Sequence, residues 1–132
     1  MIVYLDTSAA FTLLAAEAEP EPLAAALTAL DPADVLLSSR LLFTELHCAA
    51  QRRSVWDVTA VNAVLEMITL ADVTREDLDR AATSGWGLRS ADAIHLATAL
   101  RMQSEVLAAY DRELCAAGES AGLRLLRPGA TA

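Results

Sequence analysis

Short apolar runs alternate along the chain with longer stretches that have helical periodicity. The first run, Ile2–Leu5, contains β-branched and aromatic residues and is ended by Asp6, a pattern typical of a buried strand. Four further runs predict strands at Val35–Ser38, Thr69–Val73, Glu105–Ala109 and Leu123–Leu126. All five runs are short, as expected for strands that are covered on both faces.

The segments between these runs predict helices. We expect them at Ala9–Ala16, Pro22–Leu30, Arg40–Arg53, Trp56–Ile68, from Thr74 to near Ser84, Ala91–Met102, and after Asp111 to about Ala117. Ser8, Thr74 and Ser90 are candidate N-caps, and Asp77 three positions after Thr74 indicates a capping box. Because strands and helices alternate without a repeat or linker, the pattern favours one α/β domain around a mainly parallel sheet.

Composition and charge narrow the possible functions. Hydrophobic residues make up 55% of the 132-residue chain, so a substantial core can form. The formal net charge is -8, and all ten basic side chains are Arg. An acidic protein repels the phosphate backbone at long range, which argues against a general RNA- or DNA-binding module. It does not argue against a nuclease, whose carboxylates hold cations that meet the phosphate.

Cysteine usage and hydropathy give two further expectations. Cys48 and Cys115 lie in apolar, helix-like surroundings without a CxxC spacing, and we interpret both as buried free thiols. The first residues lack the basic region of a signal peptide, and charges interrupt the later apolar stretches before a membrane span is reached. We therefore predict a cytoplasmic protein without a membrane partner.

Four carboxylates lie on segments that follow predicted strands or at the start of a predicted helix. Asp6 follows the first strand and Asp111 the fourth, so both would emerge at the same edge if these strands are parallel. Glu45 lies among apolar neighbours on the helix after the second strand, and Asp92 lies in the first turn of a later helix. Taken singly, Asp6 is also explained as a turn residue, Asp92 as a first-turn acid and Glu45 as a solvated helix residue.

Taken together, the four acids predict one metal site. Clustered carboxylates repel each other unless a cation lies among them. An all-oxygen ligand set selects Mg²⁺ or Mn²⁺ over Zn²⁺. Such a site lowers the pKa of a bound water and holds a phosphodiester for in-line attack.

At these residues the sequence resembles the PIN-domain family, and more narrowly the VapC-type toxins of VapBC toxin–antitoxin modules. The likeness is carried, in order, by Asp6–Ala9, Ser39–Leu46, Leu88–Leu100 and Tyr110–Leu114, of which the third segment is the most specific. It implies a PIN-like three-layer fold with a mainly parallel central sheet flanked by helices. It also implies a nuclease domain over residues 1–127 and a flexible tail over residues 128–132.

The resemblance also implies a function. It indicates a Mg²⁺- or Mn²⁺-dependent endoribonuclease whose metal is held by Asp6, Glu45, Asp92 and Asp111, with Ser8 supporting Asp6. The expected partners are an RNA substrate, a cognate VapB-type antitoxin and a second copy of the chain. In one departure, Ala109 stands where many relatives have a Thr or Ser two positions before the last acid. A catalytically inactive PIN-like binding module therefore remains an alternative.

Other polar residues near the acids have less certain roles. Arg89 and Arg112 flank Asp92 and Asp111 and could bind RNA phosphates, although ion pairs with neighbouring acids explain them equally well. His95 lies three residues after Asp92 on the same helix face, and we interpret it mainly as a structural histidine.

Two other enzyme or signalling classes fit the sequence less well. A haloacid-dehalogenase-like phosphatase would use Asp6 as a nucleophile, but it needs a second acid two residues later, where this chain has Ser8. A receiver domain needs an acidic pair near the first strand and a late Lys, and the chain contains no Lys.

Overall fold

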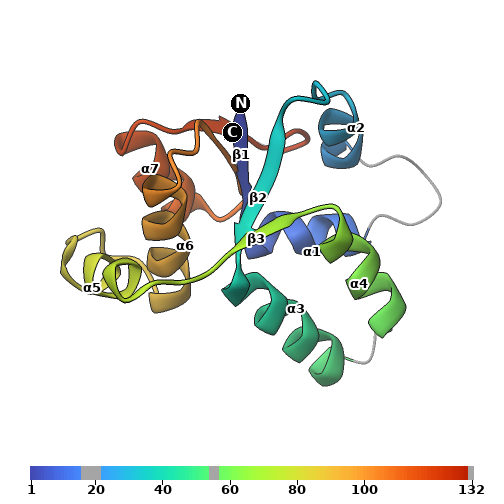
Figure 1. Ribbon diagram of the computed structural model, residues 1–132, viewed down its shortest axis with the longest axis horizontal. Coiled ribbons are helices and arrows are strands. Elements are labelled where there is room, and N and C mark those ends of the chain that lie inside the picture. Colours follow the sequence, from blue (N-terminus) through green and yellow to red (C-terminus); the bar gives the residue numbers. More distant parts are fainter. Residues whose placement is uncertain (16–21, 54–56, 131–132) are drawn as a thin grey trace.

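The computed structural model describes residues 1–15, 22–53 and 57–130. Five parallel strands form one sheet in the order β3-β2-β1-β4-β5 (Figure 1). The strands are β1 (Ile2–Leu5), β2 (Val35–Ser39), β3 (Thr69–Ala71), β4 (Val106–Ala108) and β5 (Arg124–Leu126). The helices are α1 (Thr7–Ala15), α2 (Pro22–Thr28), α3 (Arg40–Arg53), α4 (Val58–Glu66), α5 (Arg75–Thr83), α6 (Ser90–Arg101) and α7 (Arg112–Ser120).

The first strand lies at the centre of the sheet. Tyr4 of β1 is in register with Leu37 of β2 on one side and with Leu107 of β4 on the other. The chain builds outward from β1 in one direction through β2 and β3, and then in the other through β4 and β5. This reversal makes the carboxyl ends of β1 and β4 the expected place for a ligand.

Two apolar clusters cover the two faces of the sheet. Val3 and Leu5 of β1 belong to the first cluster, which includes residues of α1, α3 and α4. Tyr4 between them belongs to the second cluster, with Leu96 of α6 and Leu114 of α7. Successive side chains of a strand point to opposite faces, so this division is the signature of a buried sheet. The predicted three-layer α/β fold with a mainly parallel central sheet is confirmed.

Two predicted helix caps are wrong and one is confirmed. Ser8 lies inside α1, and the side chain that accepts from the helix is Asp6, whose Oδ1 is 3.1 Å from the Ala9 N–H. Ser90 is the first residue of α6, which has Arg89 as its N-cap and no side-chain cap hydrogen bond. The sequence places suitable residues beside each helix start but does not decide which one remains non-helical. The Thr74–Asp77 capping box is present.

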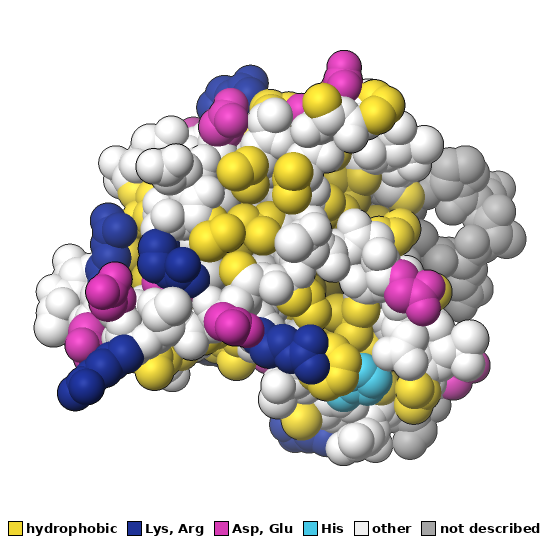
Figure 2. All heavy atoms as spheres, viewed as in Figure 1, with side chains coloured by type: hydrophobic (Ala, Val, Ile, Leu, Met, Phe, Trp, Pro, Cys, Tyr) yellow, Lys and Arg dark blue, Asp and Glu magenta, His cyan; other side chains and the backbone are white. Residues whose placement is uncertain are grey.

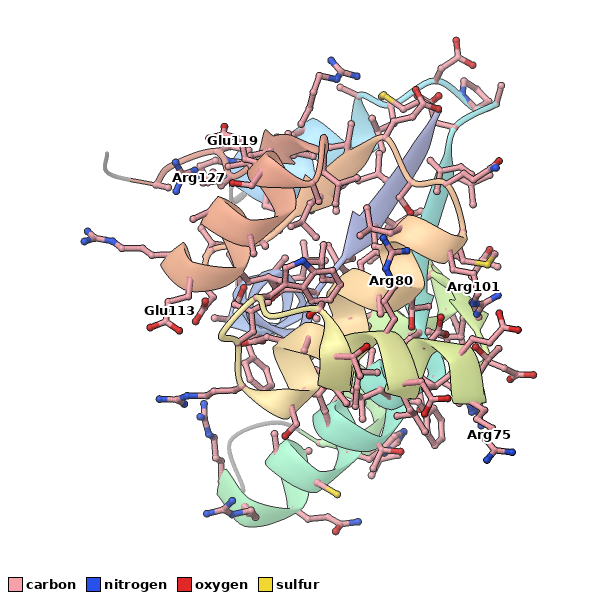
Figure 3. The ribbon with its side chains drawn as sticks, turned by 90° about the vertical axis from the view of Figure 1, so that its left-hand side faces the viewer. Arg75, Arg80, Arg101, Glu113, Glu119 and Arg127 are labelled. Carbon is pink, nitrogen blue, oxygen red and sulfur yellow. The ribbon has the colours of Figure 1, made fainter. Side chains whose placement is uncertain are left out.

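The capping box also anchors α5 to α6. Asp77 is 2% exposed, and its Oδ1 accepts from Arg101 Nε at 2.8 Å. Thr98 donates to the other carboxylate oxygen at 3.1 Å. Figure 3 shows Arg101 extending from α6 on the side of the molecule that carries α5. Asp77 is therefore a structural acid with its own cation.

The surface shown in Figure 2 carries interspersed charges. Basic side chains lie next to acidic ones there and do not form one continuous basic surface. Cys48 is exposed, so its predicted burial is wrong, whereas Cys115 is buried as expected. Cys48 lies on the outer side of α3, whereas its apolar neighbours Leu46 and Ala50 face the core.

Some predicted elements extend beyond the residues that the structure describes. Ala16 and Trp56, where two predicted helices end and begin, lie outside the described residues, as do the last two residues of the predicted tail. Near the described end of the chain, the Tyr110 hydroxyl donates to the Pro128 carbonyl at 2.7 Å. None of the helices within the described ranges has the length and apolar character needed to cross a membrane.

Candidate functional site

The four predicted acids come from four elements at one end of the sheet. Asp6 directly follows β1, and Asp111 follows β4 and is the N-cap of α7. Glu45 lies on α3, which begins directly after β2, and Asp92 lies in the first turn of α6. Because β2, β1 and β4 are adjacent and parallel, their carboxyl ends share one edge.

Asp6 is held in a fixed orientation at the centre of this edge. It is 1% exposed, and its Oδ1 accepts from the Ser8 hydroxyl at 2.8 Å and from the Ala9 N–H. The Ser8 oxygen in turn accepts from the Tyr110 N–H at 2.9 Å, so Ser8 connects the end of β1 to the segment after β4. Burial raises the pKa of Asp6 above its usual range, because these hydrogen bonds only partly offset the loss of water.

Glu45 is oriented by a buried histidine. His95 is fully buried, and its Nε2 lies 2.6 Å from Glu45 Oε1. Tyr4 contacts the other ring nitrogen, Nδ1, at 2.7 Å, and burial raises the Tyr4 pKa, so the phenol keeps its proton and donates it. This leaves the histidine proton on Nε2, where it is donated to Glu45. Thr7 donates to the same carboxylate oxygen at 2.7 Å.

The pKa of Asp92 is affected by burial and by two of the other acids. Asp92 is half-buried, and burial raises its pKa, with further contributions from the nearby carboxylates of Asp111 and Glu45. Asp111 is exposed, and its Oδ1 accepts from the Leu114 N–H at 2.9 Å as the cap of α7. The structure therefore brings Asp92, Asp111 and Glu45 within electrostatic range of each other.

The donor set fits an open site for a hydrated Mg²⁺ or Mn²⁺. Within the described ranges, no group of three or more His, Cys, Asp or Glu side chains lies close enough together to hold a metal ion by itself. Mg²⁺ does not need one, because it keeps several waters and binds to one or two carboxylates together with substrate phosphate. Asp6, Glu45 and Asp111 each commit one oxygen to a hydrogen bond. In the described part of the chain their second oxygens accept none, and so can bind a cation or its waters.

Ala109 and the arginines next to the site, Arg89 and Arg112, have defined positions. Ala109 is fully buried, and its carbonyl accepts from Cys115 Sγ at 3.3 Å, so the hydroxyl present at this strand end is that of Ser8. Arg89 and Arg112 are exposed at the starts of α6 and α7. Within the described residues neither forms an ion pair, and the Arg89 charge is close enough to Asp92 to lower its pKa slightly.

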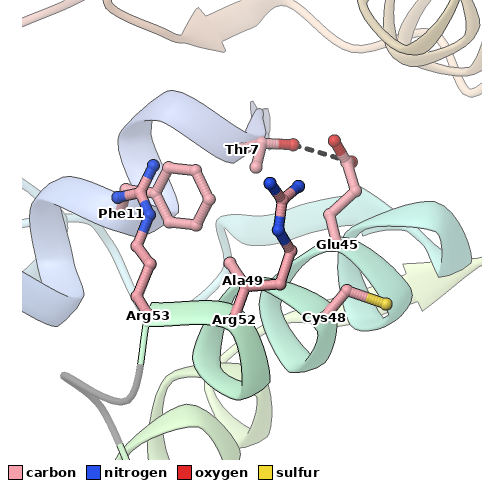
Figure 4. Close-up of a pocket in the computed structure, with 7 residues that line it drawn as sticks. All are labelled: Thr7, Phe11, Glu45, Cys48, Ala49, Arg52 and Arg53. Carbon is pink, nitrogen blue, oxygen red and sulfur yellow. Dashed lines mark hydrogen bonds between the residues drawn. The ribbon is translucent and has the colours of Figure 1, made fainter.

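Sequence reasoning missed part of this site. Thr7 and Tyr4 are not among the predicted site residues. His95, which the sequence places on the face of Asp92 and which we interpret mainly as structural, is both buried and in contact with Glu45. The available signal was spacing, since His95 lies one helical turn after Asp92 and Tyr4 lies two strand positions before Asp6. A groove next to Glu45 was also missed. It is shown in Figure 4 and is lined by Thr7, Phe11, Glu45, Cys48, Ala49, Arg52 and Arg53.

Comparison with known proteins identifies the family of the chain. The family model for the PIN domain matches residues 3–120, which is most of the chain. The chain belongs to the PIN domain family. No curated protein matches it in sequence.

Solved structures with the same fold include members of toxin–antitoxin systems. VapBC2 of Rickettsia felis, bound to a promoter DNA fragment, has a TM-score of 0.76 at 13% identity and aligns over 96% of this PIN domain chain and 98% of its own. The sarcin–ricin loop cleaving toxin VapC20 of Mycobacterium tuberculosis has a TM-score of 0.70 at 19% identity, over 88% and 95%. A toxin–antitoxin complex from Klebsiella pneumoniae has a TM-score of 0.67 at 19% identity, over 86% and 90%. At these identities the likeness shows the fold.

Proposed function

We propose that this PIN domain is an endoribonuclease that uses Mg²⁺ or Mn²⁺ held by Asp6, Glu45, Asp92 and Asp111. The observation that carries the proposal is the placement of these four acids at the carboxyl edge of a PIN-domain sheet, on the segments that follow β1, β2 and β4 and at the start of α6. Carboxylates without a compensating cation at a ligand-binding edge favour a bound cation. One of the solved neighbours is an RNA-cleaving toxin, which supports RNA as the substrate class.

The bound ion would supply an activated water and stabilise charge on the phosphodiester. The chain's own residues hold the ligands. His95 and Thr7 orient Glu45 through one oxygen, and Ser8 orients Asp6. Partners of this kind fix the ligand geometry and affect metal affinity. Arg89 and Arg112 are placed to contact phosphates outside the acidic centre.

The test is a cleavage assay on the purified chain with end-labelled RNA. EDTA should abolish cleavage, and excess Mg²⁺ or Mn²⁺ should restore it. Activity that survives exhaustive chelation would contradict the metal mechanism. If no divalent ion supports cleavage by a folded chain, the inactive binding-module alternative is correct.

We further propose an antitoxin partner and a homodimer, supported by the toxin–antitoxin systems among the solved neighbours. A guanidinium from a basic antitoxin tail could pair with two of the site carboxylates and take the place of the metal's charge. The apolar helices α2 and α4 are candidate contact surfaces. If a partner truncated of its basic tail binds but no longer inhibits, the tail covers the site. Unchanged inhibition would contradict this, and sedimentation of the free chain as a monomer would contradict the dimer.

A further inference from the structure

The groove beside Glu45 combines features that the acidic centre lacks. It has a volume of about 410 Å³ and runs between α1 and the end of α3. Glu45 and Thr7 lie at one end, Arg53 lies beside Phe11 at the other, and Arg52 lies between them (Figure 4). The groove therefore continues directly from a proposed metal ligand to two adjacent cations.

Arg52 is available to bind a ligand. It is exposed, and within residues 1–15, 22–53 and 57–130 its guanidinium forms no hydrogen bond or ion pair. Figure 4 shows this guanidinium extending into the space between the Phe11 ring and Glu45. In a chain with net charge -8, an arginine directed into a groove next to an acid site is suited to an anion that reaches that site.

Arg53 and Phe11 form the wall next to Arg52. The Arg53 guanidinium carbon lies 5.3 Å from the centre of the Phe11 ring, a cation–π arrangement. Phe11 is half-buried and packs against the core, so one part of its ring is supported while the rest faces the groove. Aromatic rings and arginine planes together are the surfaces on which unpaired bases stack.

We propose that this groove is a subsite for single-stranded RNA, in which Arg52 binds a backbone phosphate next to the cleaved bond and the Phe11–Arg53 pair stacks on the adjoining base. The proposal rests on the proposed ribonuclease function and specifies where the strand lies. An anion with an attached planar group matches the order of side chains along the groove: carboxylate and metal, then Arg52, then Phe11 with Arg53. Neither Arg89 nor Arg112 lines this groove.

RNA binding is measured separately from cleavage. The probe is a short fluorescein-labelled single-stranded RNA, titrated in Mg²⁺ against the Asp92→Asn chain so that the strand stays intact. In this background Arg52→Gln and Arg53→Gln should each weaken binding about fivefold to tenfold and reduce the salt dependence by about one unit of slope. The matched control is Arg75→Gln, which removes the same charge from an exposed position on α5 (Figure 3) and should leave affinity unchanged. Equal losses in all three variants would overturn the subsite, because a general charge effect would then explain them.

Two further measurements locate the contact. A set of RNAs with a neutral methylphosphonate at one position each should contain one for which Arg52→Gln no longer lowers affinity. Cys48 lines the groove and is exposed, whereas Cys115 is buried, so RNA should slow alkylation of Cys48 by N-ethylmaleimide. If RNA binds without protecting Cys48, or if only an antitoxin protects it, the groove is not the RNA subsite.

The outcome is separable from that of the proposed function. If the parent chain cleaves RNA and Arg52→Gln has the same KM, the subsite is wrong and the ribonuclease stands. If the parent chain binds RNA through Arg52 but never cleaves it, the ribonuclease is wrong and the subsite stands.

Discussion

Two buried carboxylates, Asp77 and Asp6, have opposite electrostatic environments. Asp77 is 2% exposed and accepts hydrogen bonds from Arg101, Thr98 and the Thr74 N–H. Burial alone would raise its pKa, but Arg101 and the hydrogen bonds lower it below the usual range. Asp6 is 1% exposed, accepts only from Ser8 and Ala9 in the described structure, and has a raised pKa.

The difference separates an acid with an Arg partner inside the fold from one that has none among the described residues. Asp77 carries its own cation, so its charge is compensated within the fold and stabilises the α5–α6 contact. Around Asp6 no Arg side chain provides that compensation within the described residues, and the pKa of Asp92, another of the proposed site acids, is raised as well. A fold tolerates uncompensated charge where a ligand supplies the missing cation. Four experiments test this contrast between Asp77 and Asp6.

The largest expected effect is on activity. Asp92→Asn should lower RNA cleavage at least about 1000-fold, because it removes a metal ligand. It should leave the stability of the metal-free chain unchanged or higher, since it removes a charge that Asp111 and Glu45 repel. Asp79→Asn, an exposed acid on α5, is the control for both measurements. If the Asp92→Asn chain cleaves RNA as fast as the parent chain, Asp92 is not part of the site.

The second experiment removes the ion pair between Asp77 and Arg101. Asp77→Ala should lower the free energy of unfolding by about 2–4 kcal/mol, because it removes a helix cap and leaves Arg101 without its partner. Asp57→Ala, which removes only the exposed N-cap of α4, should cost about 1 kcal/mol. Urea unfolding measures both. Equal losses would mean that the Arg101 ion pair adds nothing to the cap.

The third experiment uses pH and metal. The raised pKa values of Asp6 and Asp92 favour their protonated forms in the folded state, so this contribution is present below the usual carboxyl range and is lost as pH rises through the folded values. The lowered pKa of Asp77 acts oppositely: its contribution is present above the usual range and is lost as pH falls. Melting of the metal-free chain should therefore show a loss with rising pH that Asp6→Asn reduces and Asp77→Asn does not.

Metal should reverse that loss. At about ten times its Kd, Mg²⁺ should add about 1.4 kcal/mol to the stability of the parent chain near neutral pH. Asp92→Asn should show a smaller gain at the same concentration. A Tm that is independent of Mg²⁺ and Mn²⁺ in the parent chain would contradict a metal site at these acids.

The smallest expected effect is that of the buried tyrosine behind His95. Tyr4→Phe removes the O–H that donates to His95 Nδ1, so the ring is less strictly held toward Glu45. We expect kcat to fall about threefold to tenfold with KM little changed, and stability to fall by about 1 kcal/mol. Tyr110→Phe removes a hydroxyl that donates to Pro128 instead, and should leave kcat unchanged. Equal kcat values for the parent and Tyr4→Phe would show that Tyr4 has only a packing role.

Much of the fold was predictable because it depends on local pattern. Five apolar runs became the five strands, and the helix at Arg40–Arg53 has the predicted ends. Asp6 and Asp111 could be singled out because each follows a strand, Asp92 because it lies in the first turn of a helix, and Glu45 because it lies among apolar neighbours on the helix after β2. The order of the four motifs carried the resemblance to the family whose model matches residues 3–120. Helix starts were less predictable, since Asp6 and Ser8 are both good caps and only the backbone path decides between them.

The tertiary structure alone decided how these residues work together. From the sequence alone, an acidic α/β domain with carboxylates at strand ends could be predicted, because strand periodicity and the signals that begin and end helices depend on residues that are neighbours in the chain. The sheet order, the contact of His95 with Glu45 across 50 residues and with Tyr4 across 91, and the groove of Phe11, Arg52 and Arg53 depend on packing between distant segments. Burial and the distance between charges set whether the pKa of a carboxylate is lowered by a partner within the fold, as that of Asp77 is, or raised, as that of Asp6 is.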